Sequence, residues 1–149
     1  LITMAERDPL IGAHFALDVD GVVSAFFKEA SGFSNTSEVV THQAVDAAGK
    51  SVLQKIPGDL TWDDLTLSRG ITDDKALWDW RQKVIDGDVA GARANGSVIM
   101  YNQANEEMAR FNFTNGWPSA WKGPDVSSED QSVAVEEITI AHEGLTRVL

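Results

Sequence analysis

Cysteine is absent from this sequence of 149 residues, so neither disulfide bonds nor a cysteine-based metal site can hold the fold together. Apolar runs long enough to cross a membrane are missing too, and the first ten residues lack the apolar core of a signal peptide. The length is that of one ordinary domain. We therefore expect a single domain over residues 1–149, without a membrane anchor, that is assembled in the cytoplasm of the cell that makes it.

Basic side chains are scarce, with 12 Lys and Arg against 23 Asp and Glu, which gives a formal net charge of −11. This balance argues against a protein that grips nucleic acid by neutralising phosphates. A negative wall would repel an anionic cargo, which suits passage better than storage. Ordinary solubility explains the same charge, and charge alone favours that simpler reading.

Motifs that carry catalysis or bind metal are also missing. The three histidines, His14, His42 and His142, lie outside metal-ligand spacing of one another, and the sequence has neither a zinc-protease helix motif nor a nucleophile elbow. The Asp18–Gly21 segment is similar to the opening of a calcium loop, but the glutamate and spacing of that motif are absent. We therefore expect that the protein is not an enzyme and that it binds neither a cofactor nor a metal ion.

Alternating apolar residues predict most of the chain as β-strand. Phe15, Leu17 and Val19 alternate with polar neighbours, Asp20-Gly21 is a hairpin turn, and residues 22–33 form the partner strand. Asn95-Gly96 is a turn before a strand at 97–102, followed by a strand at 108–113 that Asn115–Pro118 breaks. The last strand spans 132–142, with a bulge at Glu136-Glu137 where the apolar phase changes.

One helix is predicted among these strands. Pro57-Gly58 indicates a turn, a strand with a kink at Asp63-Asp64 follows, and the helix begins at Thr72 or Asp73, whose side chains suit a helix N-terminus. Leu77, Trp80 and Val84 form one helical stripe, and Gly87 ends the helix. The predicted fold is mainly β, an antiparallel sandwich or barrel with one short flanking α-helix. The predicted core comprises Phe15, Leu17, Leu67, Leu77, Trp80, Phe111, Phe113 and Ile138.

Residues 34–54 differ in character, being polar, rich in small residues and free of bulky aromatics. They fit a mobile loop, or a long hairpin with Val39, Val45 and Val52 as sparse anchors and a tip near Gly49. Long structureless loops are uncommon in compact domains. We interpret the segment as an extended inter-subunit arm, at about 34–54, that orders on a neighbouring copy.

A set of short segments, in order along nearly the whole chain, is similar to one protein family. The segments are Asp8-Pro9 with 15–21, Phe27 with 31–33, 55–58, 65–70, 77–80, 111–118 and 137–145. The chain resembles the tail tube proteins of contractile phages of the T4 type and of phage-tail-like contractile injection systems. Residues 35–51 depart from the charged, glycine-containing stretch that this family often carries there.

The resemblance implies a structural subunit whose hexameric rings stack into a hollow tube inside a contractile sheath, with baseplate and cap proteins as further partners. It also implies that contraction drives the tube through a target envelope and that cargo, an effector or DNA, passes through the lumen. We expect Asp18 and Asp20 to face that lumen. Contacts between subunits or rings are expected at Asp8, Pro9, Thr36, Val39, Thr41, Val45, Lys50, Val52, Trp78, His142 and Glu143.

Three alternatives remain open from the sequence. A tube-initiating or tube-terminating paralogue would share the fold, and so would a type VI secretion tube protein. A carbohydrate-binding or hydrolytic β-sandwich would instead use the tryptophans and paired carboxylates, although Trp80 on the apolar stripe indicates a core residue. Assembly into rings distinguishes the first two from the third.

Overall fold

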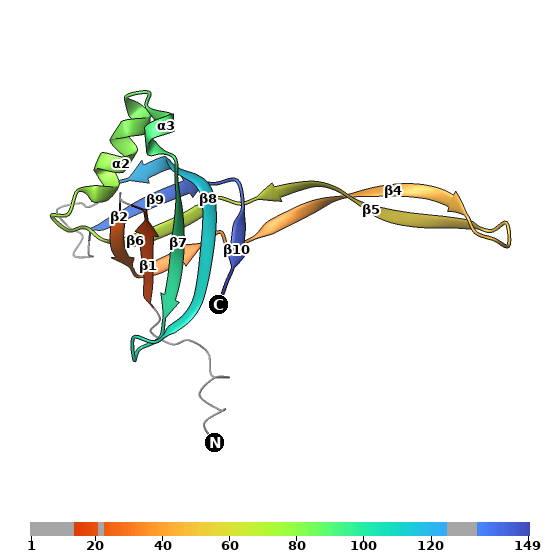
Figure 1. The fold of residues 1–149 in the computed structure, drawn as a ribbon, viewed down its shortest axis with the longest axis horizontal. Coiled ribbons are helices and arrows are strands. Elements are labelled where there is room, and N and C mark those ends of the chain that lie inside the picture. Colours follow the sequence, from red (N-terminus) through yellow and green to blue (C-terminus); the bar gives the residue numbers. More distant parts are fainter. Residues whose placement is uncertain (1–13, 21–22, 125–133) are drawn as a thin grey trace, which may run out of the picture.

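A computed structural model describes residues 14–20, 23–124 and 134–149, which form two parts of different shape (Figure 1). The first part, which we call the body, is a bent β-sheet with two helices at one end. The second part is a hairpin of strands β4 (Asn35–Val45) and β5 (Ser51–Trp62) that extends away from the body. We call residues 35–62 the arm.

The body is built on one antiparallel sheet in the order β2-β1-β7-β8-β9-β6-β3, with β10 paired to β8. This confirms the mainly β, antiparallel class. The sheet is bent around the core without closing into a barrel, since among the described residues no ladder joins its end strands β2 and β3. The strands of the body are β1 His14–Val19, β2 Val23–Phe27, β3 Glu29–Ser31, β6 Leu65–Gly70, β7 Ala94–Tyr101, β8 Glu107–Lys122, β9 Val135–Ala141 and β10 Leu145–Arg147.

Strand β8 connects the two halves of the sheet. The predicted break at Asn115–Pro118 is wrong, because the strand continues through it and changes partner there. It pairs with β7 up to Gly116 and with β9 from Trp117 onward. Asn115 has a φ of 50°, an uncommon backbone conformation, and it bends the strand rather than ending it.

Three other sequence predictions fail at strand ends. Asn95-Gly96 lies inside β7, at a register shift, and is not a turn before it. The strand predicted for 22–33 is divided at Lys28, whose backbone N–H donates to Ser68 O over 3.0 Å. The strand that Asp63-Asp64 was expected to kink is likewise two strands, β5 and β6, separated at that point.

Strand β9 carries no bulge where one was predicted. Its register with β6 is continuous from Leu65 opposite Ile140 to Gly70 opposite Val135. The Glu136 side chain points inward in phase with Ile138 and Ile140, and Val135 is exposed. The apparent change of apolar phase is therefore a buried glutamate; the residues predicted as the strand's start, 132 and 133, lie outside the described residues.

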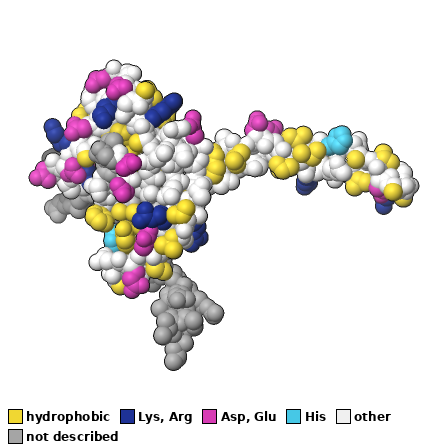
Figure 2. Space-filling view, viewed as in Figure 1, with side chains coloured by type: hydrophobic (Ala, Val, Ile, Leu, Met, Phe, Trp, Pro, Cys, Tyr) yellow, Lys and Arg dark blue, Asp and Glu magenta, His cyan; other side chains and the backbone are white. Residues whose placement is uncertain are grey.

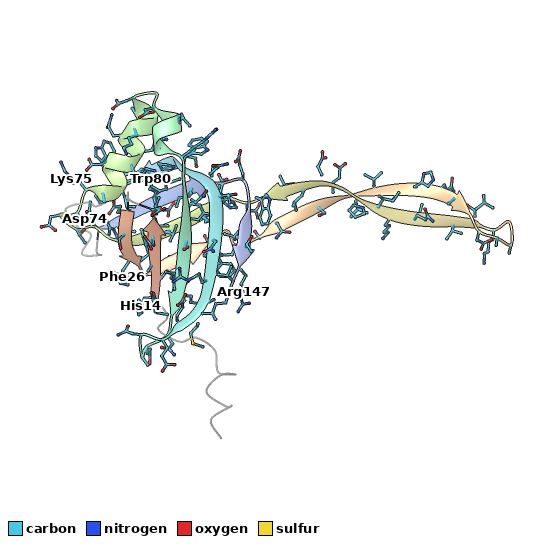
Figure 3. The ribbon with its side chains drawn as sticks, viewed as in Figure 1. His14, Phe26, Asp74, Lys75, Trp80 and Arg147 are labelled. Atoms are coloured by element: carbon cyan, nitrogen blue, oxygen red, sulfur yellow. The ribbon has the colours of Figure 1, made fainter. Side chains whose placement is uncertain are left out.

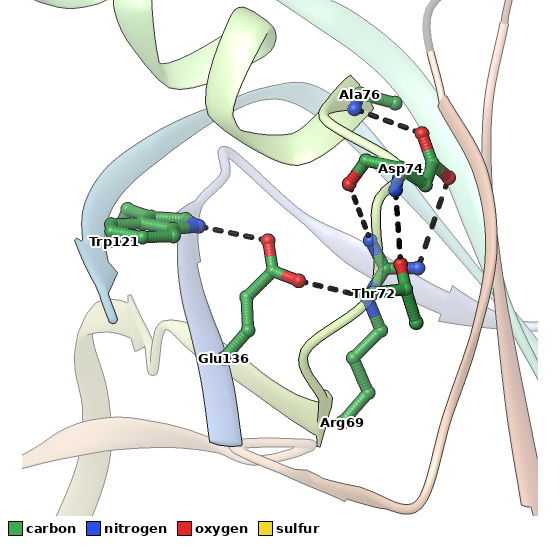
Figure 4. Close-up of polar contacts among 6 residues, drawn as sticks. All are labelled: Arg69, Thr72, Asp74, Ala76, Trp121 and Glu136. Atoms are coloured by element: carbon green, nitrogen blue, oxygen red, sulfur yellow. Dashed lines mark hydrogen bonds and ion pairs between the residues drawn. The ribbon is translucent and has the colours of Figure 1, made fainter. Parts of the chain in front are cut away.

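Within the described residues the helices are α2 (Ala76–Ile85) and α3 (Val89–Ala92), where the sequence predicted one. The predicted start at Thr72 or Asp73 is wrong. Thr72 Oγ1 accepts from Asp74 N and Asp74 Oδ1 accepts from Ala76 N, so these oxygens form turns that lead into α2 (Figure 4). The predicted end at Gly87 is confirmed, with a φ of 90° that glycine adopts readily.

The core lies between the bent sheet and α2. It includes six of the eight predicted core residues: Leu17, Leu67, Leu77, Trp80, Phe113 and Ile138. Phe15 is half-buried at its margin. Phe111 lies outside it, with its ring 4.7 Å from that of Phe33, so that assignment was wrong. Trp80 is fully buried, and its indole N–H donates to Ala92 O over 2.7 Å, which joins α2 to α3 (Figure 3).

The arm is longer than the predicted segment 34–54, because β5 continues to Trp62. Pro57-Gly58 is not a turn. Ser37 lies opposite Leu60 but Val39 opposite Pro57, so β5 carries one extra residue here, a β-bulge. A bulge is one of the few places where a strand tolerates proline, which has no N–H for the ladder. Strands of eleven and twelve residues make the arm roughly 35 Å long.

Candidate assembly surface

The arm exposes apolar side chains on both of its faces. Residues directly opposite in an antiparallel pair share a face. One set, which we call face A, is Val40, His42, Ala44, Val52, Gln54 and Ile56. The other, face B, is Val39, Thr41, Gln43, Val45, Ser51, Leu53, Lys55 and Pro57.

The exposure of these side chains is high. Seven of the fourteen large hydrophobic residues that are exposed among the described residues lie on the arm, with Val45 at 71%, Leu53 at 62% and Val39 at 61%. Figure 2 shows hydrophobic side chains distributed along the hairpin with few charges between them, and Figure 3 shows side chains projecting from both sides of its ribbon. Exposed apolar surface of this kind marks sites that bind other macromolecules.

The tip of the arm is closed by its own residues. Asp46 Oδ1 accepts hydrogen bonds from Ala48 N (2.9 Å) and Lys50 N (2.8 Å), and the Gly49 N–H donates to Asp46 O. Gly49 has a φ of 80°, a conformation that favours glycine. The hairpin therefore has a defined turn without any contribution from a partner.

The base of the arm is fixed to the body by short-range contacts. Gly32 has a φ of 93°, and a Cβ at this position would lie 1.9 Å from Asp64 O, so the two segments approach as closely as only glycine allows. Ser34 donates its hydroxyl to the Asp63 carboxylate, and Asp63 N donates to Ser34 O over 3.2 Å.

His142 occupies the junction between arm and body. Its Nε2 donates to Asp63 O over 3.0 Å, and its ring lies 5.9 Å from that of Trp62, at the end of β5, and 6.4 Å from that of Phe113 in the core. Its Nδ1 is buried and has no hydrogen-bond partner among the described residues. The neighbouring Glu143 accepts from the Asn115 side chain. Both residues were expected as contacts between subunits, and the structure shows contacts that they make within one subunit.

Trp78 lies on the exposed side of α2, where it remains 38% exposed. Its ring packs edge-on against Trp121 of β8, with 4.8 Å between ring centroids. Trp121 in turn donates its indole N–H to Glu136 Oε1 over 3.0 Å (Figure 4). The aromatic pair is therefore held in place by a buried carboxylate.

Glu136 belongs to a buried ionic network that the sequence analysis did not identify. Arg69 Nε donates to Glu136 Oε2 over 3.0 Å, and its guanidinium also contacts the backbone and carboxylate of Asp74, before α2 (Figure 4). Arg69 and Glu136 are 8% and 2% exposed. Burying an isolated charge is costly, so pairing explains why both occur here. The network joins β6, β9, β8 and the start of α2.

Asp18 and Asp20 lie at an open groove of about 360 Å³ on the face of β1, β7 and β8 that points away from the core. Asn95, Ser97, Asn112 and Thr114 also line it, and Ser97 donates its hydroxyl to Asn112 Oδ1 over 2.7 Å. The groove is polar and acidic, and the described residues hold no group of three or more His, Asp or Glu that could bind a metal ion. It offers a wall of negative and neutral polar groups.

The same side of the sheet ends at the edge strand β2. Phe26 of β2 is 64% exposed and its ring lies 6.0 Å from that of His14, which stacks on Tyr101 at 5.3 Å (Figure 3). An edge strand presents unpaired backbone groups, to which an exposed aromatic adds apolar surface. Phe26 was not among the contact residues predicted from the sequence, although it alternates with the buried Ala25 and Phe27.

The structure brings six of the predicted contact residues together on the arm: Thr36, Val39, Thr41, Val45, Lys50 and Val52. Trp78 lies far from them on α2, and Asp8 and Pro9 lie outside the described residues. Four further residues that are exposed on the arm were not predicted as contacts: Val40, Leu53, Ile56 and Leu60. Their alternation on opposed strands was the available signal. Among the described residues, no helix is long and apolar enough to span a membrane.

Residues 12–146 match the family of the T4-like virus tail tube protein gp19. Among solved structures, the fold is similar to a chain in the PVC sheath–tube complex of an extracellular contractile injection system, at 20% identity and TM-score 0.73, covering 99% of this chain and 96% of that one. A chain of the anti-feeding prophage cap has 22% identity and TM-score 0.68, covering 95% and 91%. Hcp1 from Flavobacterium johnsoniae has 16% identity and TM-score 0.53, covering 89% and 93%. No curated protein sequence is significantly similar to this chain.

Proposed function

This chain belongs to the family of the T4-like virus tail tube protein gp19, and from that membership we propose that its copies close into hexameric rings that stack into a hollow tube through the arm. It is a tail tube subunit of a contractile tail or contractile injection system, and so a structural component of a phage tail or phage-tail-like particle, without enzymatic activity.

The arm is the observation that carries the proposal. A two-stranded hairpin is marginally stable in water by itself, yet this one keeps its apolar side chains exposed and extends beyond the reach of its own core. Contact with other copies would bury those side chains. Strand β2, which carries Phe26, has a ladder only with β1 among the described residues. Pairing of this edge with a neighbouring sheet would remove unpaired backbone groups.

The orientation that we propose places the groove with Asp18 and Asp20 toward the lumen. Both carboxylates are exposed on the face of the sheet that points away from the core, whereas α2, which carries Trp78, lies on the core side of the sheet. Each ring would carry six copies of a chain with net charge −11. An acidic wall lets an anionic cargo, an effector or DNA, slide without binding.

Further partners follow from the similar structures, which come from a sheath–tube complex, a tube-terminating cap and a baseplate. We propose a sheath, a cap and a baseplate as partners of this chain, with sheath contraction driving the tube through a target envelope. The match to the T4-like family favours this branch over the type VI secretion tube. The buried Trp80 and the packed Trp78–Trp121 pair give no support to a carbohydrate platform.

Electron microscopy of the purified protein at high concentration tests the proposal. We expect rings or tubes with a central hole and sixfold symmetry. Native mass spectrometry of single rings should give six times the 16.2 kDa chain. A different multiple would contradict the hexamer but not the ring. A protein that stays monomeric at every concentration, with no rings in the images, would contradict the proposed assembly.

A further inference from the structure

The arm has apolar residues on both faces, and the body shows what one-sided burial looks like in the same chain. In β6, Leu65 and Leu67 are fully buried while Thr66 and Ser68 point outward. Such alternation is typical of a strand that is covered on one face only. An arm that lay against a single neighbour would need the same pattern.

Faces A and B do not alternate in this way. Face A carries Val40, Val52 and Ile56, and face B carries Val39, Val45 and Leu53, all of them exposed. We infer that both faces of the arm are covered at once, because the arm is inserted between two other copies of this chain rather than laid on one. This inference rests on the proposed assembly through the arm and names the geometry of that contact.

The charge distribution favours further copies of this chain as the partners on both sides. Residues 35–62 contain Glu38, Asp46 and Asp59 against Lys50 and Lys55, a net charge of −1, so the other residues carry −10 of the total −11. Two bodies of like charge repel one another. A nearly neutral insert separates them without adding repulsion.

The two faces also meet those copies with little charge of their own. Face A has no Asp, Glu, Lys or Arg, and face B has Lys55 alone. A cation facing an acidic neighbour is complementary, whereas an acidic residue in the same place would be repelled. The contact on each side is therefore expected to be mainly apolar, with Lys55 as its one basic group.

One charge placed on each face tests whether both are covered. Ile56→Lys alters face A, Leu53→Lys alters face B, and Ile85→Lys is the matched control, an exposed isoleucine at the end of α2. Because all three side chains are exposed in the subunit, the melting temperature should stay unchanged. We expect each arm variant to lower the assembled fraction by about tenfold or more, since a buried lysine is costly without a partner, and the control to assemble normally.

The outcomes separate the inference from the proposed function. If one face variant assembles like the unchanged protein while the other does not, the arm lies on a single copy and the inference is wrong, although assembly through the arm stands. If both assemble normally, the arm makes no essential contact and both proposals fail. Should a lysine variant lower the melting temperature, Ile56→Thr and Leu53→Thr provide the same comparison without a charge.

Single cysteines give a second measurement, because the chain has none of its own. We expect Val40→Cys on face A and Val39→Cys on face B to react with a maleimide at least about tenfold more slowly in tubes than in dissociated subunits. Lys83→Cys on α2 serves as the control and should react equally in both. Protection at only one of the two arm positions would overturn the inference.

Discussion

The body and the arm are built from the same strand pairing but differ in what lies beside the strands. In the body, the side chains of Leu17, Leu67 and Ile138 are buried within one subunit. The arm has a complete ladder from Asn35 to Trp62, yet its large apolar side chains are exposed. Backbone pairing therefore sets the shape of both parts, whereas only the body obtains its packing from its own chain.

Removing the arm should break this comparison most strongly. We expect replacement of residues 36–61 by a short Gly-Ser link to leave the body folded, because the core cluster contains no residue of the arm. The same variant should form no tubes. Circular dichroism and thermal melting report on the body, and electron microscopy reports on assembly. Intact tubes from this variant would show that the arm is dispensable.

The deletion must remove both strands of the arm, β4 and β5. Deleting only residues 36–53, nearly the whole segment predicted from the sequence, would leave 54–62 of β5 without its partner β4. An unpaired strand of that length is an aggregation hazard and would confuse the result.

Truncation of the two helix tryptophans sharpens the comparison within the body. Trp80→Ala should lower the free energy of unfolding by about 3–5 kcal/mol, since it empties a fully buried site and removes the hydrogen bond to Ala92 O. Trp78→Ala, two residues earlier on the opposite side of α2 and partly exposed, should cost about 1 kcal/mol through its contact with Trp121. Denaturant unfolding measures both, and equal effects would refute the assignment of the buried stripe.

The buried ion pair should behave as a unit. Glu136→Leu alone would leave Arg69 buried with only Asp74 nearby, and Arg69→Met alone would leave Glu136 unpaired, each at a cost of about 3 kcal/mol. The double variant should regain most of that loss, because two apolar side chains need no partner. A double-mutant cycle from urea unfolding measures the coupling; simple additivity of the two losses would contradict it.

A small effect on stability is expected at the junction of the two parts. His142→Phe removes the hydrogen bond to Asp63 O and should cost about 1 kcal/mol. Its effect on assembly should be larger, because His142 helps to set the direction in which the arm leaves the body. His142→Gln is the control, since it retains an N–H donor. Normal tube yield from His142→Phe would show that the hydrogen bond from His142 to Asp63 O does not orient the arm.

Much of the body was predictable because its residues follow local patterns. The alternation of β1, the stripe of Leu77 and Trp80 on α2 and the helix end at Gly87 each depend on neighbours within a few residues. The buried Glu136 was not predictable, because its partner Arg69 lies 67 residues away in the sequence. Without that partner, a charged residue in phase with Ile138 indicates a bulge.

Turn signals were the weakest guide, since the same residues serve bulges and bends. Pro57-Gly58 and Asn95-Gly96 lie inside strands at register shifts, and Asn115 bends β8 without ending it. Reading Pro57-Gly58 as a turn also set the end of the predicted arm at residue 54, which excluded Ile56 and Leu60. The contacts of the arm with other copies stay a prediction, because the sequence of one chain does not contain the geometry of its neighbours.

The closed tip at Asp46 has a consequence for how fast a tube grows. Ordering a free loop at the moment of docking costs conformational entropy, about 1–2 kcal/mol for each residue fixed. The hydrogen bonds from Ala48 and Lys50 to Asp46 already order this turn in the lone subunit. In the proposed tube, an incoming subunit would therefore meet the growing end with the tip of its arm preformed. Elongation is expected to be limited by collision and orientation rather than by folding of the arm.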